Sequence, residues 1–289
     1  MQDFSIVIPS YGKPENISEL LVSLASLTYP KSHYEVIIVD DGSPDPLSSA
    51  ALQFPAISNL TILKQHNKGP SAARNRGADI AQARYLVFTD DDCRPGPEWL
   101  QALAQALGES DRLVCGGRTV NSLPNSICAE ASQLLIDYLS KHYSPVKIYG
   151  AFFPSNNLAV SKNGFRNAGG FDESLRFGED RDFCYRCASL GFSFAYAPDA
   201  VVYHIHHQTF LSFLRLHSRY GGGTYAFRRG CAAKGLPRVQ ISPPSWYINL
   251  ILAGIQQTKS PKGVKLSLLL MVSQIAVLIG MLRGILLRR

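Results

Sequence analysis

The stretch "YLVFTDDDC", residues 85–93, joins a continuous apolar run to three consecutive aspartates. The apolar run is typical of a strand that is buried on both faces. Three adjacent carboxylates repel one another, so a buried strand ends in them only where something positive lies opposite. We therefore predict that a divalent cation lies at the end of this strand.

Three further apolar runs resemble this one, and helical patterns separate them. Runs of valine, isoleucine and leucine without alternation predict a mostly parallel sheet covered by helices on both faces, which is a Rossmann-like α/β fold. The predicted strands are residues 4–8, 35–40, 60–65 and 85–89, and the predicted helices are residues 14–27, 70–83 and 97–107, with a short helical segment near 46–54. Right-handed crossovers place the carboxyl ends of all four strands at one edge.

Polar turns, most of them with glycine, follow these strands. They read "PSYGKPEN" (9–16), "DDGSPD" (40–45), "HNKGPSAARN" (66–75) and "DDDC" (90–93). Each alone is also consistent with an ordinary turn or a solvated helix residue. Their convergence at the edge where α/β proteins bind ligands favours a functional site. Because Mg²⁺ and Mn²⁺ bind carboxylate and phosphate oxygens, we expect a metal together with a phosphate-bearing ligand.

The two ends of the chain differ in charge. Residues 1–199 hold 17 basic and 22 acidic side chains, whereas residues 200–289 hold 12 basic and no acidic ones. A basic segment suits an anionic partner, which is either nucleic acid or a membrane surface. Residues 266–282, "LSLLLMVSQIAVLIGML", carry no charge and lie between Lys265 and Arg283. This pattern favours a membrane and no nucleic acid, with a buried core helix as the alternative.

The placement of this tail relative to a membrane has two alternatives. Seventeen residues are at the lower limit for a span, so the helix either crosses the bilayer or lies in its interface. Basic residues on both sides leave its orientation open. Residues 246–255 predict an interfacial helix led by Trp246 and Tyr247. The first residues of the chain lack the basic and apolar pattern of a signal peptide. We therefore expect the part of the chain before this tail to lie on the cytosolic face of the membrane.

The six cysteines are scattered, as expected for a cytosolic region. Cys184 and Cys187 form a CxxC pattern inside a helical stretch, and no second pair follows at zinc spacing. We therefore predict core-facing thiols, with a metal or redox role as the weaker alternative.

Five segments in order resemble the motifs of family 2 glycosyltransferases with the GT-A fold. They are "SIVIPSYGKPENISELLVSLASL", "EVIIVDDGSPD", "NKGPSAARNRG", "YLVFTDDDCRPGPEWL" and "GGFDESLRFGEDRDFCYRC". The resemblance covers roughly residues 4–230. It implies a catalytic domain over residues 1–230 and a basic tail over residues 231–289. No single motif would suffice, because acidic pairs are common.

The resemblance implies a set of residues that bind the nucleotide sugar. Pro9, Tyr11 and Glu15 match the first nucleotide-contacting loop. Asp41 matches the carboxylate that accepts a hydrogen bond from the base imide. Arg74 matches the arginine near the base and the phosphates. The implied donor is a UDP-sugar by default, with dTDP or GDP as alternatives.

The resemblance also implies the metal and the base. Asp90 and Asp92 fill a DxD motif that binds Mn²⁺ or Mg²⁺, with Asp92 as the direct ligand and Asp90 as a second ligand that also binds the nucleotide sugar. Asp91 lies beside the ribose. Asp180 matches the general base of inverting members, and Glu179 its partner. A carboxylate within reach of the acceptor hydroxyl suits that role. We expect the helix that Asp180 opens to stabilise its anion, although the same position is also that of a helix cap.

Two positions extend this assignment, and one departs from the family. Some relatives complete the metal shell with a histidine in the region of "VVYHIHHQTF", which makes His204 a candidate ligand or phosphate contact. Asn156 and Asn157, in "GAFFPSNNLAVSK", are candidate hydrogen-bonding residues for the acceptor. Ala83 stands where relatives commonly have glycine, and we expect an effect on packing only.

These features predict an inverting enzyme that adds a single sugar to a glycan or lipid-linked acceptor of the cell envelope. Processive relatives usually have several spans and a QxxRW-type motif, which are absent from this sequence. A sugar-phosphate nucleotidyltransferase is one alternative, but it would need a basic, glycine-rich phosphate loop after the first strand. A catalytically silent nucleotide-sugar-binding protein is another, and such a chain would be expected to lose the DxD motif or the Glu-Asp pair.

Overall fold

We describe a computed structural model of the 289-residue chain. The described residues are 2–12, 14–44, 47, 57, 59–123, 125–142, 152–205, 208–237, 239 and 241–287. The chain forms two compact units, the first made of Met1–Val120 and Ala151–His204 and the second of Asn121–Gly150 and Ile205–Arg289. The predicted division after residue 230 falls inside a helix of the second unit and coincides with neither unit's limits.

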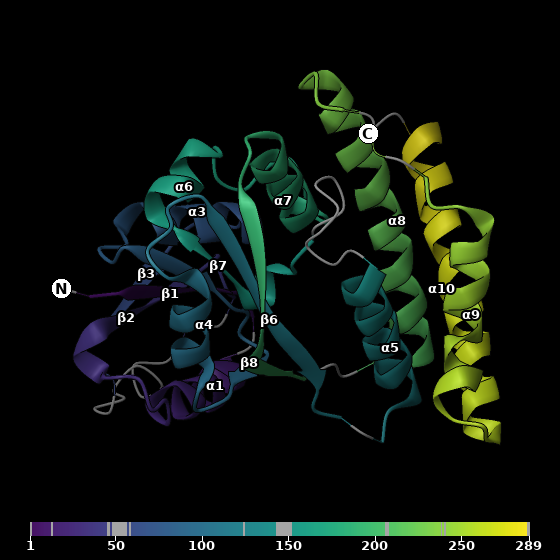
Figure 1. Ribbon diagram of the computed structural model, residues 1–289, viewed down its shortest axis with the longest axis horizontal. Coiled ribbons are helices and arrows are strands. Elements are labelled where there is room, and N and C mark those ends of the chain that lie inside the picture. Colours follow the sequence, from purple (N-terminus) through teal and green to yellow (C-terminus); the bar gives the residue numbers. More distant parts are fainter. Residues whose placement is uncertain are drawn as a thin grey trace. The chain divides into compact units, whose positions relative to one another are not determined.

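The first unit contains an eight-stranded sheet in the order β3-β2-β1-β4-β7-β6-β8-β5 (Figure 1). The four predicted strands are β1 (Phe4–Ser10), β2 (Tyr34–Asp40), β3 (Leu60–Lys64) and β4 (Tyr85–Phe88). They pair in parallel, as predicted, so their carboxyl ends lie at one edge of the sheet. The remaining strands are β5 (Cys93–Pro95), β6 (Leu113–Asn121), β7 (Leu158–Ser161) and β8 (Ser193–His204). Among them, β7 pairs antiparallel with β4 and β6, and β5 pairs antiparallel with β8.

Helices cover both faces of this sheet, as the unbroken apolar strands predicted. Along β1, Ile6 and Ile8 face one core cluster and Val7 faces the other. The first cluster includes α1 (Pro14–Ala25) and α4 (Trp99–Leu107), and the second includes α3 (Pro70–Ile80), α6 (Lys162–Asn167) and α7 (Glu179–Ser189). Two short 3-10 turns are η1 (Lys31–His33) and η2 (Ser155–Asn157). The helical segment predicted near 46–54 lies outside the described residues, apart from Leu47.

All six cysteines are buried. Cys184 and Cys187 lie on α7 within a core cluster, which confirms the prediction of core-facing thiols. Burial raises the pKa of Cys187 to about 12 and the pKa of Cys184 well above its usual value. Such thiols stay protonated at neutral pH, which argues against a redox role.

The second unit is helical. Its helices are α5 (Ile127–His142), α8 (Phe210–Ala233), α9 (Pro244–Gln257) and α10 (Pro261–Leu286). The helices predicted at residues 246–255 and 266–282 correspond to α9 and α10, and both are longer than predicted. Trp246 was expected at a membrane interface, but its ring is buried against Tyr138 with centroids 5.3 Å apart. Its neighbour Tyr247 is the partly exposed aromatic residue of the pair.

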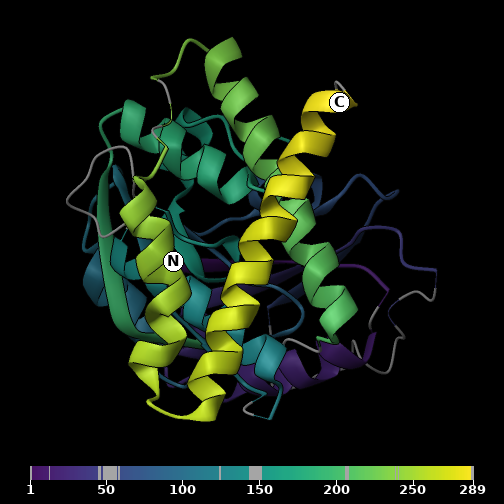
Figure 2. The ribbon, with the colours of Figure 1, turned by 90° about the vertical axis from the view of Figure 1, so that its right-hand side faces the viewer.

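Helices α8 and α10 cross closely because both have glycine at the crossing (Figure 2). A Cβ atom at Gly280 would overlap the carbonyl oxygen of Ser218, and one at Gly221 would overlap that of Val277. Small residues that let two backbones approach are typical of helix pairs in membranes. The buried residues of α10 are mostly small, namely Gly263, Ser267, Ser273, Ala276 and Gly280, and Leu266 and Leu270 are the two large apolar ones.

Helix α10 is long and apolar enough to cross a membrane. Only 22% of the residues in its most apolar 18-residue window are buried, whereas a core helix would be mostly buried. Its exposed side chains include Leu268, Ile275, Leu278, Ile279 and Leu282. The alternative of a buried core helix therefore does not fit the described structure.

Candidate active site

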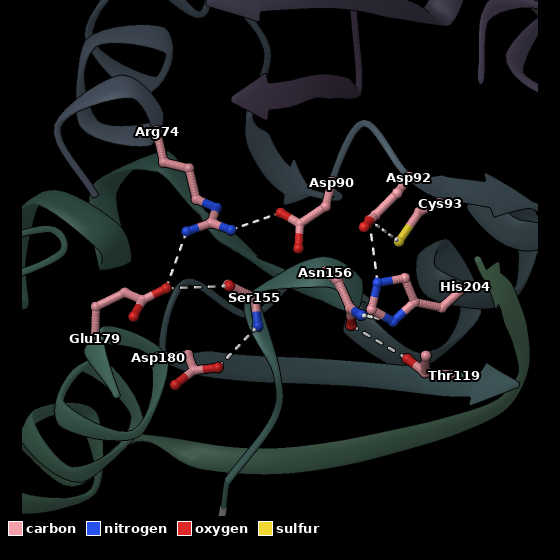
Figure 3. A network of polar contacts seen from close by, with 10 residues as sticks. All are labelled: Arg74, Asp90, Asp92, Cys93, Thr119, Ser155, Asn156, Glu179, Asp180 and His204. Atoms are coloured by element: carbon pink, nitrogen blue, oxygen red, sulfur yellow. Dashed lines mark hydrogen bonds and ion pairs between the residues drawn. The ribbon is translucent and has the colours of Figure 1, made fainter. Parts of the chain in front are cut away.

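The polar residues predicted at the strand ends come together in the first unit (Figure 3). Asp41 follows β2, and the three consecutive aspartates follow β4. Arg74 lies on α3, and Glu179 and Asp180 open α7. Gly178, with φ of 85°, precedes α7 in the left-handed region that favours glycine, which lets the chain turn into the helix at the site.

Arg74 provides the positive charge opposite the aspartate run. Its guanidinium lies 2.5 Å from Asp90 and 3.0 Å from Glu179, and the residue is only 3% exposed. Burial lowers the pKa of Arg74, but the charges of Asp90 and Glu179 outweigh burial and raise it. Gly77 lets α3 approach the strand closely, because a Cβ atom there would overlap Val7. One arginine thus connects the predicted DxD motif to the predicted base.

The other two aspartates have partners of their own. The hydroxyl of Ser10 donates to Asp91 at 2.9 Å. His204 Nε2 lies 3.1 Å from a carboxylate oxygen of Asp92. Burial lowers the pKa of His204, and the hydrogen bond and charge of Asp92 raise it to give a net increase. Each carboxylate of the run is therefore paired with a different residue, which relieves their mutual repulsion.

Asp92, Cys93 and His204 form a candidate metal site. Their ligand atoms all lie within 4.8 Å of one another. Burial and the adjacent Asp92 raise the pKa of Cys93 well above its usual value, so its thiol is a poor ligand. A carboxylate and an imidazole remain, and this pair fits Mn²⁺ better than Mg²⁺, which prefers oxygen ligands. Asp90, which we predicted as a second ligand, lies outside this cluster and pairs with Arg74.

Asp180 has the environment of a general base. One oxygen accepts from the backbone N–H of Arg181 at 2.7 Å and the other from that of Ser155 at 3.3 Å. Burial, and next the charge of Glu179, raise the pKa of Asp180 to about 7. The backbone N–H of Arg181 at the helix start lowers the pKa of Asp180, but burial and Glu179 outweigh this effect. A pKa near 7 suits proton transfer at neutral pH.

Asp41 organises the loop that follows β3. Its carboxylate accepts hydrogen bonds from the Gln65 side chain at 2.7 Å and from the backbone N–H groups of Lys68 and Gly69 at 2.9 and 2.8 Å. These three donors satisfy most of the acceptor positions of this buried carboxylate. One acceptor position of the four on a carboxylate then remains for a ligand. The predicted contact with a base imide stays a prediction, and sequence reasoning missed Gln65.

A cavity of about 910 Å³ lies beside this loop. Its lining includes Lys64, Gln65, His66, Lys68 and Arg76. The basic side chains among them had not been identified from sequence, because single lysines and arginines in a polar loop carry no distinctive spacing. They make the cavity suitable for an anionic ligand, although Asp79 and Glu173 also line it.

The three residues predicted for the first nucleotide-contacting loop differ in exposure. Pro9 is buried inside β1, Tyr11 follows the strand with its side chain exposed, and Glu15 is exposed in the first turn of α1. Ser43 accepts from the backbone N–H of Gly12 at 2.9 Å, which joins this loop to the turn after β2. Tyr11 and Glu15 are thus accessible to a ligand, and the role of all three stays a prediction.

Both asparagines predicted for the acceptor have partners inside the protein. Asn157 is fully buried; it accepts from the indole of Trp99 and donates to the carbonyls of Arg118 and Ala200. Both amide hydrogens and one lone pair of its oxygen are used inside the core, which favours a structural role over the predicted acceptor contact.

Asn156 lies behind the candidate metal site. Its amide nitrogen lies 3.3 Å from Nδ1 of His204, and its oxygen accepts from Thr119 at 3.2 Å. Residues that hold a ligand histidine from behind fix the orientation of its ring. The structure therefore favours a positioning role for Asn156 over acceptor binding. Thr119 and Ser155 were missed from sequence, since their roles depend on partners far along the chain.

Comparison with known proteins shows the family. Residues 5–167 match the family described as "Glycosyl transferase family 2". The chain is 33% identical over 202 residues to glycosyltransferase AglE of Haloferax volcanii, a match that covers 69% of this chain and 66% of that protein. It is 31% identical over 192 residues to the poly(ribitol-phosphate) beta-N-acetylglucosaminyltransferase TarS of Staphylococcus aureus, covering 63% of this chain and 32% of TarS.

Solved structures share the fold. The mannosyltransferase PcManGT of Pyrobaculum calidifontis, in complex with GDP-Man and Mn²⁺, matches with a TM-score of 0.69 and 16% identity over 99% of this chain and 88% of that chain. Residues 1–349 of S. aureus TarS in complex with UDP-GlcNAc match with a TM-score of 0.55 and 21% identity, over 97% of this chain and 89% of that chain. These likenesses confirm the predicted GT-A fold, and the chain belongs to glycosyl transferase family 2.

Proposed function

We propose that the protein is an inverting, metal-dependent glycosyltransferase that moves one sugar from a nucleoside diphosphate sugar to an acceptor hydroxyl. The observation that carries this proposal is the arrangement around Arg74. This residue joins Asp90, beside the candidate metal site, to Glu179, beside the candidate base. Membership of the family adds support, and it disfavours the sugar-phosphate nucleotidyltransferase.

The donor occupies the edge formed by the strand ends. The nucleotide lies by Asp41 and the loop that this carboxylate holds, and the basic cavity beside the loop attracts its phosphates. Relatives bind UDP-GlcNAc and GDP-Man, so both UDP and GDP sugars are donor candidates. Asp92 and His204 would hold a Mn²⁺ ion, and a divalent cation there would neutralise the charge developing on the departing nucleoside diphosphate.

Asp180 takes the proton from the acceptor hydroxyl. The backbone N–H groups of Ser155 and Arg181 hold its carboxylate in one orientation. Glu179 helps to keep the pKa of Asp180 raised. At neutral pH, part of the carboxylate population is then ionised, and it is basic enough to accept the proton of the acceptor hydroxyl. Direct attack by the deprotonated hydroxyl on the anomeric carbon inverts its configuration. Arg74, by pairing with Glu179, limits how far the negative charge there raises the pKa of Asp180.

The acceptor is a glycan or a lipid-linked molecule at the cytosolic face of a membrane. Support for this part comes from α10, whose large apolar side chains are exposed along a helix long enough to span a bilayer. Exposed apolar surface of this extent marks an interaction site. Bringing the catalytic unit to the bilayer would concentrate it with an acceptor carried by lipid.

The experiment that tests the function is a panel of nucleotide sugars offered to the full-length protein with Mn²⁺. Release of nucleoside diphosphate is followed, and the anomeric configuration of the product is determined by NMR. We expect turnover with one class of donor, inversion of configuration, and a loss of about 10² or more in rate for Asp180→Asn. Donor binding without turnover by any donor would instead support a silent binding protein, and retention of configuration would remove Asp180 from its role.

A further inference from the structure

A groove lies along the α8–α10 pair in the second unit. Its volume is about 430 Å³, and only residues of these two helices line it. Figure 2 shows the two helices crossing. The lining includes three arginines, Arg215, Arg219 and Arg283, and three branched apolar residues, Val272, Ile275 and Ile279. A groove of this composition differs from an ordinary solvated face, because cationic and apolar side chains share one hollow.

The three arginines give the groove a positive charge. All three are exposed, and Arg215 and Arg219 are one helical turn apart on α8. Residues 205–289 contain no acidic residue. The acids of the second unit are Glu130 and Asp137, both on α5 and neither in the groove. Glu130 is paired with Lys262 at 2.8 Å.

The apolar side of the groove is continuous with the exposed face of α10. Ile275 and Ile279 are 49% and 44% exposed, although they line the groove. Leu278 and Leu282 extend the exposed apolar surface along the same helix. If a soluble anion bound the arginines, this apolar surface would stay exposed to water. Nucleic acid would also leave it exposed, because its backbone offers phosphates but no hydrocarbon chain. A ligand that fits must carry an anion and a long apolar chain together.

We propose that this groove binds an anionic phospholipid of the membrane. The headgroup phosphate lies against the three arginines, whose planar guanidinium groups match phosphate oxygens in pairs. An acyl chain lies along Val272, Ile275 and Ile279. The proposal concerns membrane recognition by the second unit, and it is independent of the transfer reaction of the first. Binding in the groove would give the protein a preference for anionic lipids, which burial of the apolar surface of α10 alone would not give.

The test compares binding of the full-length protein to two kinds of vesicle, one of phosphatidylcholine alone and one containing 30% phosphatidylglycerol, by flotation. The groove variant is Arg215→Gln/Arg219→Gln/Arg283→Gln. The matched control, Arg229→Gln/Lys259→Gln/Lys265→Gln, removes the same charge from exposed positions outside the groove. General attraction to the anionic surface is worth about fivefold per basic residue in both variants. We expect the groove variant to lose at least about tenfold more of the preference for phosphatidylglycerol than the control.

Several results would overturn the proposal. Equal losses in the two variants would show that only the surface potential acts. Millimolar glycerol 3-phosphate that abolishes the preference would show a site for soluble anions. If the preference for phosphatidylglycerol disappeared when the protein self-associates, the groove would instead be a contact with a second copy of the chain. Circular dichroism checks that helix content is kept, and the variant with lysine at all three positions, which retains the charge, should recover only part of the preference.

Discussion

The acid limb of the pH–rate profile depends on Asp180. If this carboxylate is the base, the rate follows its ionised fraction. With a pKa of about 7, the rate should fall about tenfold for each pH unit below neutrality, and at pH 5 only about 1% of the enzyme would be active. An ordinary aspartate, with a pKa near 4, would keep the rate constant over this range. Burial and Glu179 therefore predict an acid limb that an unperturbed carboxylate would not show.

Glu179→Gln tests the cause of this limb. Removal of the adjacent negative charge lowers the pKa of Asp180, so the limb should move to lower pH. It should move only part of the way, because burial is the larger cause and persists. The assay is release of nucleoside diphosphate at saturating donor and metal between pH 5 and pH 9. Glu98→Gln, a change at an exposed position at the start of α4, should leave the limb in place. A wild-type rate that is flat from pH 5 to pH 7 would refute the reasoning.

The remaining predictions concern the metal, the buried arginine, the helix crossing and the membrane. Asp92→Ala should abolish metal-stimulated turnover, and excess EDTA should do so reversibly; full activity in EDTA would argue against a metal. Arg74→Gln leaves two carboxylates without their cation and should cost about 3 kcal/mol of unfolding free energy, seen as a lower Tm by calorimetry. Gly280→Ala should destabilise the second unit by about 1–3 kcal/mol through overpacking, whereas Gly230→Ala, with open space around it, should stabilise by up to about 1 kcal/mol; equal melting in detergent would contradict the close crossing. Alkaline carbonate should leave the protein in the membrane fraction if α10 spans and release at least part of it if α10 lies in the interface.

The parallel half of the sheet was predictable because its signal is local. Unbroken apolar runs such as residues 35–40 identify strands buried on both faces, and β1, β2 and β4 follow this pattern, whereas the edge strand β3 is only partly buried. The antiparallel half escaped prediction. β5 has three residues and β7 four, and β6 contains two adjacent glycines. Strands of this kind are specified by their partners rather than by their own composition.

The identities of the site residues were predictable, but their partners were not. Arg74 and Glu179 are 105 positions apart in the chain, and only the fold brings them together. Asn157 shows the same limit: the sequence places it next to the site, but only the structure shows that Trp99 from α4 and two carbonyls are partners of its amide. The sign of the pKa shift of Asp180 also needed the structure. The position at a helix start is visible in sequence, but the degree of burial is not.

The burial of all six cysteines makes the native protein nearly inert to thiol-directed labels. Burial raises the pKa of Cys115 and Cys187 to about 12 and that of Cys128 above its ordinary value. Maleimides and spin labels react with the thiolate, which these side chains do not form at neutral pH. A single Leu278→Cys substitution on the exposed face of α10 would therefore offer one reactive thiol on an otherwise natural chain. A fluorophore attached there, quenched from within the bilayer or from the aqueous phase, would measure the depth of this helix without removal of any native cysteine.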